Sequence, residues 1–283
     1  MIAFLGTGLL GSNFTKALLK KGHAVQVWNR TPIKSKALEA FGAKAFSGPQ
    51  DAVKGATRIH LALSDDAAVD SVLEAASPSF ETGVVIIDHT TTSAQGAVER
   101  TVLWKRRGFE YIHAPVFMGP VNAFEGTGFM LVSGEQGLLE KWEPELSAMT
   151  GKLINFGTDP SKAAAMKLLG NLFLICMTAG ISETLSLAKS LAVPPSDLET
   201  LFSSWNPGAL VPARLKRITN GKYSDASWEL KMARKDARLM MNQAATGNAP
   251  LHLLPAIAQE MDRWIEKGHG NDDWVVIAKD NLP

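Results

Sequence analysis

The sequence predicts an α/β fold built on a doubly wound parallel sheet, followed by an all-α C-terminal domain. In the first half of the 283 residues, short apolar runs alternate with helical patterns, as in parallel strands joined by crossover helices. From about residue 160 onward the strand-like runs give way to long helical patterns with Pro and Gly breaks. We therefore expect two domains, residues 1–159 and residues 160–283.

Each element of this scheme rests on an apolar run or on a helical pattern. Strands are expected at 2–5, 23–28, 59–63, 84–88, 111–116, 129–134 and 153–157. Helices are expected directly after the first strand, after residues 64–66, and over 34–41, 93–107, 161–191, 196–203, 208–219, 226–246 and 250–267. Because strands and helices alternate up to residue 160, we place these strands in one parallel sheet.

A glycine-rich turn, Gly6-Thr7-Gly8-Leu9-Leu10-Gly11, connects the first strand to the first helical pattern. In a dinucleotide site of the Rossmann type, the first glycine permits the tight turn and the second lets the backbone approach a pyrophosphate. The third lets helix and strand pack closely, and the free N–H groups at the helix start face the phosphates. An ordinary strand–turn–helix connection is the alternative, but the second strand that follows favours a cofactor. The predicted contacts are Gly6, Gly8, Leu9, Leu10 and Gly11.

The end of the second strand indicates which cofactor binds. NAD-selective sites usually carry a carboxylate there, on the ribose 2′-hydroxyl. This chain has Asn29-Arg30-Thr31 instead, with no carboxylate to repel a phosphate. The guanidinium of Arg30 can stack on or bond to a 2′-phosphate, while Asn29 and Thr31 offer neutral hydrogen bonds. The sequence therefore predicts NADP(H) over NAD(H), with a solvated turn before Pro32 as the alternative.

Composition and charge exclude several classes of partner. With 29 Lys and Arg against 28 Asp and Glu, the net charge is +1, so we expect neither nucleic acid nor a membrane as a partner. The longest uncharged apolar stretch, 168–182, is expected to be too short to cross a bilayer. With the first strand at residue 2 and a single cysteine, Cys176, we expect a cytoplasmic protein without a signal peptide or a disulfide. No His, Cys or carboxylate cluster has metal-ligand spacing, so no metal is predicted.

The long helical pattern after residue 160 carries the residues expected to do chemistry. Lys167 and Asn171 are four residues apart and share one helix face within an apolar segment. A lysine there is costly unless it reaches solvent or a partner, so a snorkelling lysine beside a structural asparagine is the alternative. A nicotinamide enzyme that reduces a carbonyl must protonate its oxygen, and a lysine ammonium can supply that proton. The apolar surface of this helix is too wide for one face, which predicts a homodimer or homotetramer.

Six motifs, in this order, resemble those of the β-hydroxyacid dehydrogenases, the family of 3-hydroxyisobutyrate dehydrogenase and the glyoxylate/succinic semialdehyde reductases. They are the glycine turn with Asn29-Arg30-Thr31, Asp88-His89-Thr90-Thr91, Ala114-Pro115-Val116 with the loop after it, Lys167-Leu168-Leu169-Gly170-Asn171, Trp228 with Lys235-Asp236, and Gly268-His269-Gly270-Asn271-Asp272-Asp273. The resemblance covers nearly the whole chain. It implies that Lys167 is the general acid/base and that Asn171 positions it.

The resemblance also implies contacts with cofactor and substrate outside these two residues. Leu63 and its neighbour Ser64 are expected to line the adenine or ribose side of the cofactor. Thr91 and Lys235 are expected to approach the nicotinamide ribose or the phosphates. Thr91 and Trp228 are also expected to contact the substrate.

The chain departs from the family where the substrate loop begins. Phe117-Met118-Gly119 stands where the family usually has Ser-Gly-Gly, so a serine hydroxyl and one flexible glycine are absent. If Phe117, Met118 and Gly119 face the substrate, as we expect, the pocket is narrower and more apolar than in the hydroxy-acid enzymes. The alternative is that Phe117 packs into the domain core.

These observations lead to an expected activity and two alternatives. We expect an NADPH-dependent oxidoreductase that reduces a small aldehyde, ketone or keto acid to the hydroxy compound. An imine reductase of the same architecture is one alternative, but such enzymes generally lack a lysine at the position of Lys167. A non-catalytic NADPH-binding protein is the other. The Lys167–Asn171 pair argues against it, whereas the altered substrate loop keeps it open.

Overall fold

The computed structural model describes residues 1–282, which form two compact units. The first spans Met1–Leu172 and the second begins at Phe173, and each has a hydrophobic core of its own. The division falls inside helix α8 (Lys162–Ser190), so the first turns of that helix belong to the N-terminal unit. The sequence pattern had placed the boundary before this helix, at 159/160.

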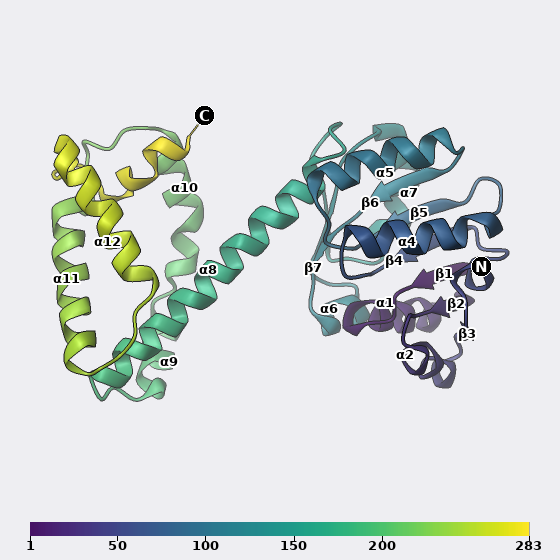
Figure 1. Ribbon diagram of the computed structural model, residues 1–283, viewed down its shortest axis with the longest axis horizontal. Helices are drawn as coiled ribbons and strands as arrows, with labels where there is room; N and C mark the ends of the chain where they lie inside the picture. Colours follow the sequence, from purple (N-terminus) through teal and green to yellow (C-terminus); the bar gives the residue numbers. More distant parts are fainter. Residues whose placement is uncertain (283) are drawn as a thin grey trace. The chain divides into compact units, whose positions relative to one another are not determined.

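A six-stranded sheet forms the centre of the first unit (Figure 1). Its strand order is β3-β2-β1-β4-β5-β6, and every pairing in it is parallel. The strands are β1 (Ile2–Leu5), β2 (Val25–Trp28), β3 (Lys44–Phe46), β4 (Arg58–Leu61), β5 (Val85–Asp88) and β6 (Glu110–His113). Successive side chains of β1 point to opposite faces of the sheet. Phe4 packs into one hydrophobic core and Leu5 into a second, so both faces of the sheet are covered. The predicted Rossmann-type fold class is confirmed.

The helices of the first unit divide between these two cores. Helices α1 (Leu9–Lys20), α6 (Pro120–Glu125) and α7 (Gln136–Ser147) supply apolar residues to one core. Helices α3 (Pro49–Ala52), α4 (Asp66–Ala76) and α5 (Ala94–Arg106) supply the other. The helix expected at 34–41 is instead a short α2 (Pro32–Lys36) and a 3₁₀ turn (Glu39–Phe41), because Leu38 and Phe41 donate to carbonyls three residues back.

The prediction that all strands belong to one parallel sheet is wrong for the last three strands of the first unit. Strands β7 (Val116–Phe117), β8 (Phe129–Val132) and β9 (Lys152–Asn155) form a separate three-stranded sheet, in which β7 and β8 are antiparallel. The strand expected at 111–116 is therefore two strands. The Ala114 N–H donates to Asp88 O at 2.7 Å, and Pro115 has no N–H with which to continue the ladder. The chain leaves the first sheet at this point.

The second unit is helical. After the rest of α8 it contains α9 (Pro195–Ser204), α10 (Val211–Thr219), α11 (Leu230–Thr246) and α12 (Leu253–Trp264), with short turns at Pro207–Leu210, Ile265–His269 and Trp274–Asn281. Its core includes Leu230, Ala237 and Trp264. By length and composition alone, α8 is the one helix within residues 1–282 that could cross a membrane. The expectation from the sequence concerned the uncharged stretch 168–182 within this helix, and it stays a prediction.

Candidate active site

The glycine turn has the close contacts that its spacing predicts. Gly6 has φ +95°, and a Cβ on it would lie 2.3 Å from Ala62 O. A Cβ on Gly11 would lie 1.9 Å from Gly6 O, so any side chain there would push α1 off the turn. A Cβ on Gly8 would meet nothing within 4 Å, because the turn is open on that side. This is the side from which a pyrophosphate can approach the start of α1.

A cleft of about 570 Å³ opens beside the turn, at the carboxyl ends of β1, β2 and β4. Seven of the predicted cofactor residues line it: Gly6, Gly8, Asn29, Arg30, Thr31, Leu63 and Ser64. Gly11 lies beneath the turn, Leu10 packs against the core, and Leu9 is 80% exposed on the outer side of α1. The carboxyl ends of the strands in a parallel sheet are where such folds bind their ligands.

The cleft also contains residues that the sequence reasoning missed. Lys34 lines it beside Arg30 and Thr31, and no carboxylate is among the residues that line it within the described chain. Lys34 lies on the short helix α2 that follows Asn29-Arg30-Thr31, so the signal was a second cation just after the end of the second strand. Pro49 and Val72 add apolar wall on which an adenine ring can pack. A cleft with two cations and no carboxylate is suited to a phosphate-bearing ribose.

Asn29 lines the cleft and also stabilises the backbone around it. Its Oδ1 accepts the N–H of Thr7 at 2.9 Å, and its Nδ2 donates to Thr31 O at 3.1 Å. The residue thus ties the glycine turn to the end of β2. Thr7 Oγ1 is buried and has no partner within residues 1–282. The open face at Gly8 and the cleft beside it fit a nicotinamide dinucleotide.

The loop after β5 is held from below by a buried polar network. Asp88 Oδ1 accepts the N–H of Thr90 at 2.9 Å, and its Oδ2 accepts the Tyr111 hydroxyl at 2.7 Å. Arg100 donates to Tyr111 Oη at 3.1 Å and pairs with Asp66 at 2.6 Å. Burial and the neighbouring Asp88 raise the pKa of the Tyr111 hydroxyl well above its ordinary value, so it stays a donor. The network gives the loop one conformation.

This network decides which threonine of the loop is accessible. Thr90 and Thr92 are buried, whereas Thr91 is partly exposed. Thr90 Oγ1 accepts the N–H of Leu63 at 3.0 Å, which connects the loop to the wall of the cleft. Of the three threonines 90–92, Thr91 alone is accessible to solvent, and it is the one predicted to contact cofactor and substrate.

Lys167 and Asn171 meet as their spacing predicts. Lys167 Nζ donates to Asn171 Oδ1 at 3.0 Å on the first turns of α8. The same Nζ lies 4.2 Å from the centroid of the Phe117 ring, from β7. A Cβ on Gly170 would lie 2.2 Å from Phe117 Cζ, so the ring rests directly on the helix backbone. Burial lowers the pKa of the Lys167 ammonium below its ordinary value.

The three residues of the altered substrate loop have different surroundings. Phe117 faces Lys167 and α8 rather than the core of the first unit. Met118 packs against that core. The Gly119 N–H donates to Asn122 Oδ1 at 2.9 Å, so it is not free to bind a carboxylate. Of the three, Phe117 alone is placed beside the lysine.

Trp228 and Lys235 belong to the second unit. Trp228 is partly exposed and packs edge-on against Trp274, with 5.7 Å between the ring centroids. Lys235 lies on α11 and pairs with Asp236 at 2.9 Å. Their contacts with substrate and cofactor remain predictions. Asp273, from the last motif, is buried and structural: it accepts the Ser227 N–H at 2.8 Å and pairs with Arg217 at 3.0 Å.

The parallel sheet, the glycine turn and the cleft at the strand ends define a nicotinamide-dinucleotide-binding oxidoreductase. Residues 1–157 match the family model of the NAD binding domain of 6-phosphogluconate dehydrogenase, and the chain belongs to this family. Within it the chain is of the β-hydroxyacid dehydrogenase type, which confirms the resemblance found in the sequence motifs.

Three relatives illustrate this placement. The chain is 26% identical to 2-(hydroxymethyl)glutarate dehydrogenase from Eubacterium barkeri, over 98% of this chain and 93% of the relative. It is also 26% identical to 3-sulfolactaldehyde reductase from Escherichia coli, over 98% of this chain and 94% of the relative. The solved structure of an imine reductase from Myxococcus stipitatus with NADP+ superposes with a TM-score of 0.91, at 22% identity and 99% coverage of both chains. That last likeness shows the fold.

Proposed function

We propose that this protein is an NADPH-dependent reductase that converts a small aldehyde or ketone, including a keto acid, to the alcohol. The observation that carries the proposal is the partly buried Lys167, hydrogen-bonded to Asn171, in a chain whose first unit binds a nicotinamide dinucleotide. When bound, the cofactor supplies the hydride that the carbonyl carbon receives. The chain must then supply one proton to the carbonyl oxygen.

Lys167 is suited to supply that proton. An ammonium has three N–H donors; one is taken by Asn171, and one side of the group faces the Phe117 ring. A donor remains for the substrate oxygen, and the positive charge stabilises the alkoxide as it forms. Because burial lowers the pKa of Lys167, its proton leaves more readily than that of an exposed lysine. Asn171 fixes where the ammonium points.

The preference for NADPH over NADH rests on the cleft. Arg30 and Lys34 provide two cations, and Thr31 a neutral donor, where the 2′-phosphate of an adenosine ribose is expected. A planar guanidinium and a flexible ammonium together form charge-assisted hydrogen bonds with a phosphate. NADH lacks the 2′-phosphate, so its binding is not strengthened by the two cations.

The proposal is tested by turnover with a panel of substrates. The purified protein is given NADPH or NADH with glyoxylate, succinic semialdehyde, methylglyoxal or a cyclic imine, and consumption of the reduced cofactor is followed. We expect carbonyl reduction with NADPH. Lys167→Ala should lower kcat/KM by about 10²–10⁴-fold and leave the NADPH Kd unchanged, because the lysine acts on the substrate. Lys167→Arg should not restore the rate, because a guanidinium holds its proton too tightly.

The same panel separates the alternatives. Turnover of the cyclic imine alone, unaffected by Lys167→Ala, would identify an imine reductase instead. NADPH binding with no turnover of any substrate would indicate a non-catalytic NADPH-binding protein. Lys162→Ala, at an exposed lysine in the first turn of α8, is the matched control for a mutation in this helix and should keep the wild-type rate.

We also propose that two copies of the chain pair through α8. Large apolar side chains are exposed along this helix: Leu168, Leu169, Leu172, Phe173, Leu174, Ile175, Met177, Ile181 and Leu185. A contiguous apolar surface of this size marks an interaction site in a soluble protein. The polar residues Lys167 and Asn171 within the same helix support a protein partner over a bilayer, because both would be costly in hydrocarbon. A homodimer or homotetramer meets this need with a second copy of the same surface.

A further inference from the structure

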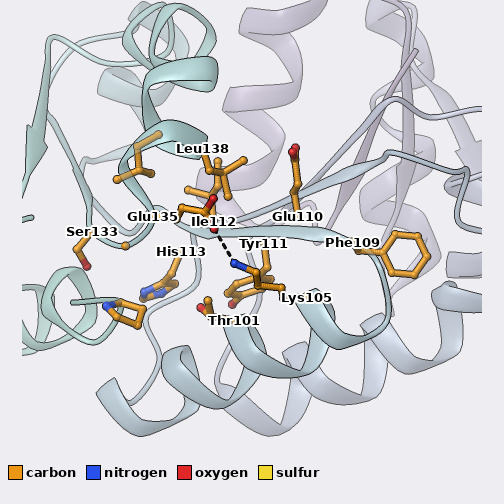
Figure 2. A pocket seen from close by; sticks show the side chains of 13 residues that line it. Thr101, Lys105, Phe109, Glu110, Tyr111, Ile112, His113, Ser133, Glu135 and Leu138 are labelled. Atoms are coloured by element: carbon orange, nitrogen blue, oxygen red, sulfur yellow. Dashed lines mark hydrogen bonds and ion pairs between the residues drawn. The ribbon is translucent and has the colours of Figure 1, made fainter. Parts of the chain in front are cut away.

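A second cavity, of about 240 Å³, lies in the first unit between α5, β6 and the start of α7 (Figure 2). It shares no lining residue with the cofactor cleft. Its volume suits one ring-sized molecule rather than a dinucleotide. Nothing in the proposed reaction uses it, so its chemistry has to be derived from its own walls.

One wall is the unpaired edge of the large sheet. Strand β6 is last in the strand order and pairs only with β5 within the described chain. The Ala114 N–H donates to Asp88 O, and in a parallel ladder bonding alternates along the strand. The N–H and C=O groups of Tyr111 and His113 therefore point away from β5. Residues 109–113 all line the cavity, so this row of donors and acceptors borders it.

His113 adds a buried side-chain acceptor. Its side chain lines the cavity, is 3% exposed, and makes contacts through Nε2 to Thr90 O at 2.9 Å and to Thr92 Oγ1 at 3.2 Å. Because a carbonyl can only accept, Nε2 carries the proton of the neutral ring. Nδ1 is then a lone pair, and it has no partner within residues 1–282. Because Nδ1 has essentially no exposed surface, it lies behind the cavity wall, and the free N–H and C=O groups of β6 supply the polar contacts to an occupant.

The remaining walls are apolar, with one further polar group. Leu138, Leu139 and Phe109 line the cavity. Ser133 Oγ accepts the Ala163 N–H at 2.9 Å, which leaves its own proton available to an acceptor on the occupant. Lys105 on α5 and Glu135 before α7 form an ion pair of 2.8 Å between two sides of the cavity (Figure 2). Both side chains are exposed, so the pair can open at little cost.

We propose that this cavity binds a small aromatic carboxamide. A carboxamide carries one acceptor and two donors, the same functional groups that a neighbouring strand would offer to the edge of β6. Its N–H groups can meet the free backbone carbonyls of Tyr111 and His113 on β6. The amide oxygen can accept from a β6 N–H or from Ser133. The aromatic ring fills the apolar part against Leu138 and Leu139.

The experiment is a titration of the apo protein with benzamide, followed by ¹H–¹⁵N NMR. We expect saturable shifts at the amides of Tyr111, His113 and Gly134, with a Kd of ~1–10 mM for a molecule of this size. Contacts between benzamide ring protons and the methyls of Leu138 and Leu139 should appear in NOE spectra. Acetophenone has nearly the same shape, with a methyl group in place of the NH2, and it should bind at least about 5-fold more weakly.

A cavity-filling variant locates the site. Leu138→Trp should abolish the benzamide shifts, while Leu103→Trp, on the exposed side of α5, should leave them in place. Thermal melts of both variants show whether either has a folding defect. If Leu138→Trp does not fold, the NOE contacts in the wild-type protein decide whether benzamide binds in this cavity. The proposal fails if benzamide gives no saturable shifts, since the cavity then holds water only. It also fails if acetophenone binds as tightly as benzamide, or if the shifts persist in folded Leu138→Trp.

Discussion

At the scale of single residues, Arg30 is the side chain on which cofactor choice depends most. It lines the cleft with Lys34 and no carboxylate. Arg30→Asp removes one charge-assisted pair and places a carboxylate near the phosphate. We expect NADPH binding to weaken by about 2–4 kcal/mol, which is ~30–1,000-fold in Kd. NADH binding should change much less. Fluorescence titration with both cofactors measures the two constants.

The control for Arg30→Asp is Arg106→Asp, at an exposed position at the end of α5. It makes the same change of net charge away from the cleft and should leave both Kd values close to those of the wild type. If the wild-type protein binds NADH as tightly as NADPH, the interpretation of Asn29-Arg30-Thr31 as a phosphate site is wrong.

Phe117 is the residue that should set the substrate range. Its ring covers one side of the Lys167 ammonium, so a substrate approaching that side meets an aromatic face and no hydrogen-bond donor. Such a surface ranks substrates by size and disfavours a carboxylate. Phe117→Ser restores the family's hydroxyl and should lower the KM for glyoxylate or succinic semialdehyde. Steady-state kinetics with both acids and with an uncharged aldehyde of similar size measures the change.

Met118 provides the contrast, because its side chain packs against the core. Met118→Gly should lower the free energy of unfolding by about 2–5 kcal/mol, through the cavity it leaves and the added chain entropy. It should leave the KM for carboxylates unchanged. A fall in KM that requires Met118→Gly and does not occur with Phe117→Ser alone would contradict this division of roles.

At the scale of elements, β4 and the loop after β5 are joined by a chain of buried histidines. His89 contacts Ala114 O through Nδ1 at 2.8 Å, and His60 Nδ1 lies 3.0 Å from His89 Nε2. A carbonyl only accepts, so His89 donates to Ala114, and His60 donates to His89. Both rings are neutral in this arrangement. Burial lowers the pKa of His89 to about 4 and that of His60 well below its ordinary value.

These buried histidines predict how the free energy of unfolding depends on pH. Burial also lowers the pKa of His113, so above pH ~6.5 all three buried histidines are neutral in the folded and unfolded states and contribute no slope. Below it, the unfolded chain takes up protons that the folded protein does not bind. The free energy of unfolding should therefore fall by ~1.4 kcal/mol per pH unit per histidine, until the pH reaches the folded-state pKa. Urea unfolding at pH 8, 7, 6 and 5 should show a flat region followed by this decline.

The carboxylates with lowered pKa values do not interfere in this range; they are Asp65, Asp66, Glu135, Asp159, Glu260 and Asp273. Their stabilisation is present above the unfolded-state pKa of ~4 and is lost only as the pH falls below it. The window from pH 7 to 5 therefore isolates the histidines. An unfolding midpoint that stays constant across that window would show that the buried rings do not resist protonation.

At the scale of the whole molecule, α8 determines the expected assembly. Ile175 is 68% exposed in the single chain, near the middle of the helix. Ile175→Glu places a charge in the proposed interface between copies and should weaken association at least ~100-fold. Light scattering during size-exclusion chromatography should show the wild type as a dimer or tetramer and the variant as a smaller species. Leu103→Glu, on the exposed side of α5, should keep the wild-type mass.

Two results would contradict the proposed assembly. A wild-type protein that is monomeric at micromolar concentration leaves the apolar side of α8 without the proposed partner. A wild-type protein that sediments with membranes and needs detergent would show that a bilayer covers α8, which its length and composition permit.

The sequence by itself determined the fold class, the family and most of the cofactor cleft. Those inferences depend on local rules: Gly6 and Gly11 are required by contacts with atoms on the adjoining strands and turn, and Lys167 and Asn171 meet because helical spacing brings them together. Lys34 could have been predicted in the same way, as a second cation just after Asn29-Arg30-Thr31.

Only the tertiary structure decided the features that depend on partners distant in the chain. Pro115 ends the pairing of β6, so β7 joins another sheet and brings Phe117 to Lys167, 50 residues further along the sequence. Buried Asp88, Tyr111 and Arg100 hold the loop that leaves Thr91 accessible among three consecutive threonines. The unpaired edge of β6 and its cavity exist because no later strand within residues 1–282 pairs with β6. Periodicity cannot reveal such contacts, because long-range packing rather than local spacing fixes them.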